Sequence, residues 1–537
     1  MILALLALMA HAAEPDPLLD ALGRWADLGP EQLVLDGEKP YRTVVAAADR
    51  EFFSADASFG ALSGTSRGRS RPARVEAVIG SDARSSSRYR TGRVLGLPDL
   101  PDEDVAIAID RDLWLALDTS FKASVKQLEV KTAALGQLAS AWPPDRAPAM
   151  PTIAVDDARP EPVDRDALTA RILTASAAFR EFPLLRSGHA SVSATDGRYL
   201  LATSDGTRLA QPEGYAAIYV WCEAVRPDGV LVWAGEQWVG RRAGDLPTAE
   251  DLASAARKLA TEVSARVAAP VVEYYEGPVI FEGEAAIQLF AQLAVPETLG
   301  TPPAPPGDRT YSQLVRSGPR IGRHILPEGW SVADDPGDNP LVPAWDREGV
   351  PGQAVELVRD GVVVDLLMTE IPREDLRGSN GHARGDVQSA WTARPVAWTV
   401  TPQRVASDRA FDRAADRARS DARLDRILVV RALARRTEGT LPSPTRAVWR
   451  YADGHEEEAV GLEFQRADRR ILRDISAATG PLTQTYLATE GGGGAGTTRG
   501  MPTMGTAPAR VLVTEVEAVA AGGSEEPPAI PMPPLDP

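Results

Sequence analysis

The chain has 537 residues, enough for two to four domains at about 100–200 residues each. Its hydrophobic content of 44% and charged content of 25% are those of a soluble globular protein. The formal net charge of −17 excludes nucleic acid and anionic membrane surfaces as expected partners, because both carry negative charge.

The first residues have the pattern of a secretory signal. Met1 to Ala10 is a short apolar run, and Ala10-His11-Ala12 offers an A-x-A cleavage site. We therefore predict a signal peptide over residues 1–12 and a periplasmic or secreted protein. The alternative is a cytoplasmic protein whose start is misassigned or whose first helix is buried. The run is shorter than the about 20 residues that cross a bilayer, so we expect no membrane span.

Residues 13–268 predict an N-terminal α+β domain with an antiparallel sheet and long helices. Residues 110–141 carry apolar side chains at helical spacing, at Trp114, Leu117, Phe121, Val125, Leu128, Leu135 and Leu138. Residues 143–163 contain six prolines and predict an irregular connection. A second helix is expected after Asp164, and Thr248 can cap a third that runs to about Val267.

Strands are predicted between the second and third of these helices. Asp196-Gly197 and Asp205-Gly206 predict turns between short apolar runs. Pro227-Asp228-Gly229 predicts a hairpin that joins residues 215–225 to residues 230–239.

A boundary is predicted near Ala269-Pro270, and residues 269–522 predict a second, strand-rich domain. Strands are expected at 279–281, 355–358, 362–368, 448–451 and 511–517. An Ala-rich helix is expected over Ala285–Leu293. Residues 408–436 predict a helix with a solvated, charge-laced face. The Pro-rich tail at 523–537 predicts disorder.

Few residues are candidates for catalysis or metal binding. The single cysteine, Cys222, lies in a strand-like run and is expected to be buried and inert. No two of the five histidines have the spacing of a helical zinc pair: His11, His189, His324, His382 and His455. The carboxylate clusters Glu282/Glu284, Asp334/Asp335 and Glu456–Glu458 are expected on solvated surface. The residues alone therefore predict no metal site in this chain and leave its catalytic residues unknown.

Three segments in order resemble one family. Residues 272–292, with Tyr275-Glu-Gly-Pro-Val before an Ala-rich helix, resemble the start of the C-terminal domain of the TldD/PmbA family. Ser379–Gly385 resembles that family's Gly-His-Ala segment, and residues 508–517 resemble its closing strand. In TldD-type members the Ala-rich helix carries His-Glu-x-x-x-His. Here it reads Glu284-Ala-Ala-Ile-Gln-Leu-Phe-Ala-Gln, which is similar to the PmbA (TldE) type.

This resemblance, over residues 190–520, implies a two-domain α+β molecule with a mostly-β, barrel-like C-terminal domain. It also implies proteolysis or peptide processing by an assembly in which a zinc-bearing subunit pairs with a metal-free one. Unfolded or extended peptide would be the ligand, and Asn380, His382 and Arg384 are the candidate peptide contacts. The alternative for these residues, which we favour, is a structural Gly-rich turn whose backbone approaches another strand.

Three hypotheses for the function remain. The first is a non-metal subunit or peptide-binding pseudo-peptidase, with no cofactor of its own and with zinc on a TldD-like partner, or a homodimer. The second is an active metallopeptidase with scattered ligands such as His324 or His382. The third is a non-enzymatic envelope interaction protein.

Overall fold

The computed structural model describes residues 16–87, 95–137, 142–156, 164–302, 320–373, 376, 378–434, 440–487 and 502–521. The predicted signal peptide and the predicted tail lie outside these residues, so both stay predictions. The described residues form two large sheets with helices packed on them, which confirms the α+β class. None of the described helices is long and apolar enough to span a membrane.

The first sheet and its helices come from the chain up to residue 268. Their bounds are α1 Pro17–Gln32, β1 Pro40–Ser58, β2 Ala61–Ser70, β3 Ala73–Ile79, α2 Ala106–Leu135, β4 Ile153–Val155, α3 Arg165–Ala177, β5 Ser187–Thr203, β6 Arg208–Val225, β7 Leu231–Gly240 and α4 Ala249–Ala268. Strands β1, β5 and β6 are long, antiparallel and adjacent. Strands β2 and β3 both pair with β1, and β4 and β7 both pair with β6.

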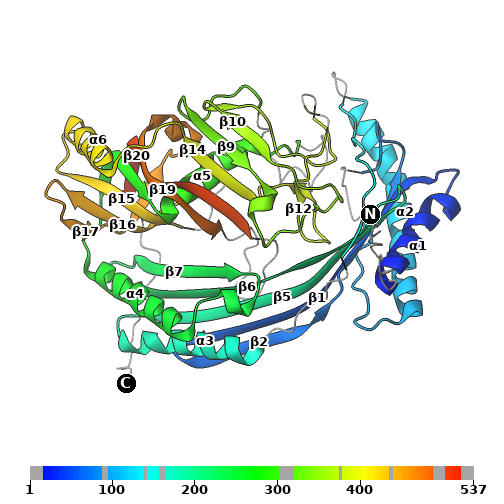
Figure 1. Cartoon of the computed structure of the whole chain (residues 1–537), viewed down its shortest axis with the longest axis horizontal. Helices are drawn as coiled ribbons and strands as arrows, with labels where there is room; N and C mark the ends of the chain where they lie inside the picture. Colours follow the sequence, from blue (N-terminus) through cyan, green and yellow to red (C-terminus); the bar gives the residue numbers. More distant parts are fainter. Residues whose placement is uncertain are drawn as a thin grey trace, which may run out of the picture.

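One face of this sheet carries the helices. Helices α3 and α4 cover one half of the sheet, against side chains such as Ile218 and Val220 of β6. Helices α1 and α2 cover the other half on the same face, against Leu200 and Ala202 of β5. The strands curve, and the C-terminal elements lie on the side opposite these helices (Figure 1).

The second sheet comes from the chain after residue 273. Its elements are β8 Tyr274–Glu282, α5 Glu284–Leu293, β9 Trp330–Asp334, β10 Val355–Arg359, β11 Val362–Val363, β14 Ala397–Pro402, α6 Asp408–Asp421, β15 Arg426–Leu433, β16 Pro444–Tyr451, β17 Glu456–Glu458, β18 Leu462–Gln465, β19 Ile475–Leu487 and β20 Thr503–Ala520. A two-stranded pair, β12 Ala383–Arg384 and β13 Thr392–Ala393, lies apart from it.

The order of the second sheet runs β11-β10-β9-β14-β20-β8-β15-β16-β17, and β18 and β19 also pair with β20. The path ends at β11 and β17 without closing among the described strands, so the barrel-like detail is not confirmed. The apolar core of this region lies between α5 and strands such as β8, β15 and β20.

Several local predictions are confirmed. The Asp164 side chain caps α3, and Thr248 and Asp251 form a reciprocal capping box at the start of α4. The hairpin at Pro227-Asp228-Gly229 joins β6 to β7. Cys222 is fully buried, and burial raises the pKa of its thiol to about 12. The thiol is therefore protonated at neutral pH and weakly reactive.

The predicted helix over 408–436 is wrong beyond residue 421. Helix α6 ends at Asp421, and Arg423 adopts a left-handed backbone with φ 57°. The residues that follow form β15, a parallel neighbour of β8 with Val429 and Val430 fully buried. A buried parallel strand has a nearly continuous run of apolar residues. The alternating charges of α6, just before this run, made the whole segment resemble a single helix.

The predicted turn at Asp196-Gly197 is also wrong, because both residues lie inside β5. Gly197 is needed there for close approach to β1. A Cβ at position 197 would lie 2.1 Å from the backbone oxygen of Asp49. A glycine inside a strand often marks such an approach instead of a turn.

Two predictions about the N-terminal region are corrected in part. The connection at 143–163 contains strand β4, which pairs in parallel with β6, while residues 157–163 lie outside the described residues. In α2, Leu117 and Phe121 are buried as predicted, but Trp114 is 51% exposed. Leu138 of the predicted stripe lies outside the described residues.

Candidate functional site

Helix α5 stands where the resemblance places a zinc helix, and its inner face is apolar. Ile287, Leu289 and Phe290 are at most 1% exposed and belong to the core beneath the second sheet. The Phe290 and Trp330 rings lie 5.7 Å apart. Gln288, the polar residue of this stretch, accepts a hydrogen bond from the backbone of Leu433 at 2.7 Å. These side chains do not fit a zinc ion, which needs nitrogen, sulfur or carboxylate donors.

Asn380, His382 and Arg384 lie in one loop, and their side chains point into the protein. His382 is fully buried, and its Nε2 lies 3.0 Å from Asp334 Oδ1. The Asn380 side chain accepts from Met368 N at 2.7 Å and donates to Leu366 O at 2.8 Å. Arg384 donates to the carbonyl oxygen of Trp345 at 3.0 Å. Each side chain holds backbone in place, and contact with a peptide stays a prediction.

The other described histidines lie far apart in the fold. His189 on β5 stacks on Trp221 of β6 with ring centroids 4.7 Å apart. His455 stacks on Tyr451 in the turn between β16 and β17. His324 forms an isolated bridge with Val362. Within the described ranges, no three His, Cys, Asp or Glu side chains gather as a metal-ligand set.

The carboxylate clusters expected on the surface divide into two kinds. Glu282 and Glu456 both pair with Arg431 at partly exposed positions. Asp334, in contrast, is fully buried and takes part in the His382 contact. The surface interpretation is therefore wrong for Asp334, whose neighbour in the fold is 48 residues away in the sequence.

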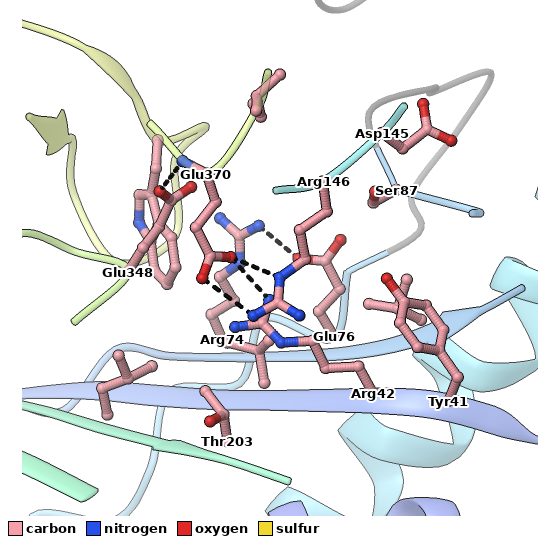
Figure 2. Close-up of a pocket in the computed structure, with 15 residues that line it drawn as sticks. Tyr41, Arg42, Arg74, Glu76, Ser87, Asp145, Arg146, Thr203, Glu348 and Glu370 are labelled. Atoms are coloured by element: carbon pink, nitrogen blue, oxygen red, sulfur yellow. Dashed lines mark hydrogen bonds and ion pairs between the residues drawn. The ribbon is translucent and has the colours of Figure 1, made fainter. Parts of the chain in front are cut away.

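A cavity of about 80 Å³ lies where the first sheet meets the loops of the second region (Figure 2). By the usual measure of about 10–15 Å³ per water, it has room for a handful of water molecules. Charged side chains line it from β1, β3, the 142–156 segment and the C-terminal loops. We call one ion-paired group the polar seam: Arg42 of β1, Arg146 of the 142–156 segment, Glu348 and Glu370 of the C-terminal loops, and Asp205 of the β5–β6 turn, which lies outside the cavity lining but pairs with both arginines.

Ion pairs hold the seam together. Arg146 donates two hydrogen bonds to Glu370, at 2.8 and 3.0 Å, and one to Asp205 at 2.7 Å. Arg42 lies 3.3 Å from Glu370 and 3.0 Å from Asp205. Figure 2 shows both guanidinium groups directed at the Glu370 carboxylate. The seam thus ties two C-terminal loops to the first sheet.

Glu348 is the unusual member of the seam. One of its carboxyl oxygens accepts a hydrogen bond from Glu370 N at 2.6 Å. Burial raises the pKa of Glu348 well above its usual 4.5, and the charges of Glu370 and Asp346 raise it further. Burial likewise raises the pKa of the neighbouring Asp346 to about 6, against the opposing influence of Arg384. Glu348 therefore keeps its proton at pH values where an exposed glutamate has lost it.

A second buried ion pair lies beside the seam. Arg347 donates to Glu213 of β6, and the Arg50 Nη2 of β1 lies 2.6 Å from the same carboxylate. Burial opposes the ionisation of Glu213, but Arg347 and Arg50 outweigh it and lower its pKa to about 2. The Arg347 guanidinium also lies 4.4 Å above the Tyr199 ring. Neighbouring residues of one loop thus insert the Arg347 cation and Glu348, an acid of raised pKa, between the two sheets.

Perturbed acids in a cavity mark candidate functional sites, because catalysis and proton binding need shifted pKa values. The seam can hold a proton on Glu348 beside a carboxylate fixed by arginines. Sequence reasoning missed these residues. Glu348 and Glu370 are 22 residues apart, and the Arg146 partner of Glu370 lies 224 residues upstream of it, so no local pattern could indicate the site.

Comparison with known proteins bears on the same C-terminal region. Residues 275–436 match the family model described as the PmbA/TldA metallopeptidase C-terminal domain. This part of the chain is therefore a C-terminal domain of the TldD/PmbA family. The matched stretch contains β8, α5 and the His382 loop, which are segments that carried the resemblance. A search of the curated proteins gives no match.

Solved structures share the fold of this chain over nearly its whole length. TldE from Thermococcus kodakarensis is 16% identical with a TM-score of 0.59, covering 94% of this chain and 100% of that one. A Thermotoga maritima protein described as a candidate modulator of DNA gyrase is 12% identical with a TM-score of 0.60, covering 93% and 99%. A similarly described Bacteroides thetaiotaomicron protein is 9% identical with a TM-score of 0.53, covering 93% and 98%.

Proposed function

We propose that this chain is the metal-free, peptide-binding member of a peptidase assembly, paired with a zinc-bearing chain of the same family. The apolar inner face of α5 carries the proposal. Where a zinc helix would present two imidazoles and a glutamate, this helix presents Ile287, Leu289 and Phe290 to the core. The likeness in fold to a TldE supports the same assignment.

The face of the first sheet that is turned toward the C-terminal elements (Figure 1) offers side chains suited to extended peptide. On the face opposite α3 and α4, the aromatic side chains are only partly buried, because odd-numbered residues of β6 point away from the helices. We call this the open face: His189 of β5, Tyr219 and Trp221 of β6, and Trp233 of β7. Aromatic groups with polar tips bind peptides of varied sequence, because they combine a large apolar surface with hydrogen-bonding capacity.

The direct test is zinc content and peptidase activity of the purified chain. We expect close to no zinc per chain and no hydrolysis of unfolded polypeptide by the chain alone. Adding the zinc-bearing family member of the same genome should produce hydrolysis that a chelator stops. One zinc per chain together with chelator-sensitive cleavage by the chain alone would contradict the proposal and favour the scattered-ligand alternative.

Peptide binding is tested separately by fluorescence anisotropy with a labelled unfolded peptide. Trp221→Ala should weaken binding about tenfold, since loss of one central aromatic contact costs on the order of 1–2 kcal/mol. Trp238→Ala is the matched control, because Trp238 packs on the helix-covered side of the sheet. Equal effects of the two substitutions, or none from Trp221→Ala, would remove the open face from the proposal.

A further inference from the structure

Helix α2 has an exposed apolar surface that nothing in the described fold covers. Its inner side packs on the first sheet through Leu113, Leu117 and Phe121. On its outer side, Ile107 is 80% exposed, Trp114 51% and Leu115 44%. Single exposed apolar residues are ordinary, but a tryptophan flanked by two aliphatic side chains on one helix face marks an interaction surface.

Charged residues continue the same outer face in an order that complements itself. Arg111, Asp118, Lys122 and Glu129 are seven, four and seven residues apart, which places them on one side of the helix at about 100° per residue. Their signs run plus, minus, plus, minus. Read in the opposite direction, every sign is reversed, and the pairs 111/129 and 118/122 share one midpoint, residue 120.

We infer that the outer face of α2 is a contact between two copies of this chain, with the two helices antiparallel about a two-fold axis at the level of residue 120. In this arrangement Arg111 faces Glu129 of the second copy, and Asp118 faces Lys122 of the second copy. The symmetry repeats both pairs. Trp114 lies against the turn of the second copy that carries Val125, and the apolar surface is covered.

The charges make a second copy the fitting occupant. An unrelated partner would need the reverse charge order on its own surface, whereas this helix already supplies it. Within one chain Lys122 lies 2.7 Å from Asp118, with side chains 60% and 38% exposed. Such an exposed ion pair contributes little to stability. Asp118 and Lys122 can therefore pair with the second copy instead, at a small cost in free energy.

The size of the contact sets the expected affinity. Helix α2 has 30 residues, about 45 Å at 1.5 Å per residue. A contact confined to this helix falls at the small end of specific interfaces, so we expect a reversible dimer with a dissociation constant of order micromolar. The inference goes beyond the proposed function. Helix α2 and the open face lie on opposite faces of the first sheet, so both can be occupied at once.

The experiment is sedimentation velocity of the full chain from about 1 to about 100 μM, across the expected dissociation constant. The wild-type chain should shift from monomer to dimer. Trp114→Glu and Ile107→Glu should each weaken the dimer at least tenfold. Val405→Glu is the matched control, at a residue 53% exposed outside α2, and should leave the dimer unchanged.

Charge reversal tests the register. Arg111→Glu and Glu129→Arg should each weaken the dimer, and the double variant should restore it. Mixed Arg111→Cys and Glu129→Cys chains should cross-link on oxidation, since the single native cysteine is buried. Arg111→Cys alone should not, because residues 111 of the two copies would lie about 27 Å apart along the helices.

Three results would overturn the inference. The first is a monomer throughout the concentration range. The second is a dimer that Trp114→Glu does not weaken. The third is a double charge variant no better than the single ones. None of these measurements depends on zinc, on peptide or on the zinc-bearing partner, so failure here leaves the proposed function standing.

Discussion

The interior of this protein contains two very different contacts, the α5 core and the polar seam. Around α5, Ile287 and Phe290 pack against aliphatic and aromatic side chains, and their contribution depends little on pH or salt. Between the sheets, the partly or fully buried groups are arginines, the Glu370 carboxylate and Glu348, whose pKa is raised. The stability of the polar seam therefore depends on the presence of each ion-pair partner and on pH, whereas the stability of the α5 core does not.

The difference bears on function. The apolar inner face of α5 has no metal ligand to offer. The seam is costly to assemble, because each buried charge loses its hydration. A contact of this kind fixes how the C-terminal loops sit on the first sheet, and with them the His382 loop.

The largest expected effect is loss of a buried ion-pair partner next to the seam. Arg347→Met should destabilise the protein by about 3–5 kcal/mol, because Glu213 would remain buried with only Arg50 to balance it. Urea unfolding followed by circular dichroism measures this. Replacing both partners, with Arg347→Met and Glu213→Leu, should cost less than the single change. A single change within about 0.5 kcal/mol of wild type would show that the pair is not desolvated.

A cavity in the α5 core should cost slightly less. Ile287→Ala removes three buried carbons and should destabilise by about 2–5 kcal/mol. In contrast to the seam variants, this loss should be the same at pH 5 and pH 8. Unfolding curves at the two pH values measure it, with Ile287→Val, expected at about 0.5–1.5 kcal/mol, as the graded control. A loss of stability that differed between pH 5 and pH 8 would show that the α5 core is no less sensitive to pH than the polar seam.

The pH response of the seam should be intermediate in size. The unfolded Glu348 ionises near 4.5, whereas the folded one stays protonated to higher pH. Below pH 4.5, Glu348 is protonated in both the folded and the unfolded protein, so it does not lower the free energy of unfolding. As pH rises toward the folded pKa, the unfolded state binds fewer protons, so stability falls by up to about 1.4 kcal/mol per pH unit.

Glu348→Gln should remove this decline, because the amide stays neutral and can still accept from Glu370 N. Its stability relative to wild type should rise steadily as the pH increases above about 4.5. The exposed Glu463→Gln serves as control and should run parallel to wild type. Parallel curves for Glu348→Gln would show that Glu348 titrates normally in the folded protein.

The smallest effect is expected at an exposed ion pair. Arg470 lies 2.8 Å from Asp468, but its side chain is 76% exposed. Arg470→Ala should change stability by no more than about 0.5 kcal/mol, and the change should vanish at high salt. The same urea experiment measures it. A loss as large as that of Arg347→Met would mean that burial does not separate the two kinds of ion pair.

Local patterns by themselves determined much of this protein. The helix expected after Asp164 begins there, Thr248 caps α4 as expected, and the 227–229 hairpin forms, because these features depend on neighbours in sequence. The resemblance to the TldD/PmbA family was also visible in the sequence, and two of the three segments that carried it overlap the residues that match the family model. The apolar character of α5 follows directly from its residue types, since Ile287, Leu289 and Phe290 have no metal-binding atoms.

Only the tertiary structure decided the rest. Val429 and Val430 became a strand because β8 and β16 lie on either side to pair with them. Trp114 became exposed because helix α2 presents its other side to the sheet. Glu348 keeps its proton because Glu370 and burial act on it together, and Arg42 meets Glu370 from more than 300 residues away. Periodicity encodes the local backbone, whereas the state of a buried charge depends on whichever groups the fold brings around it.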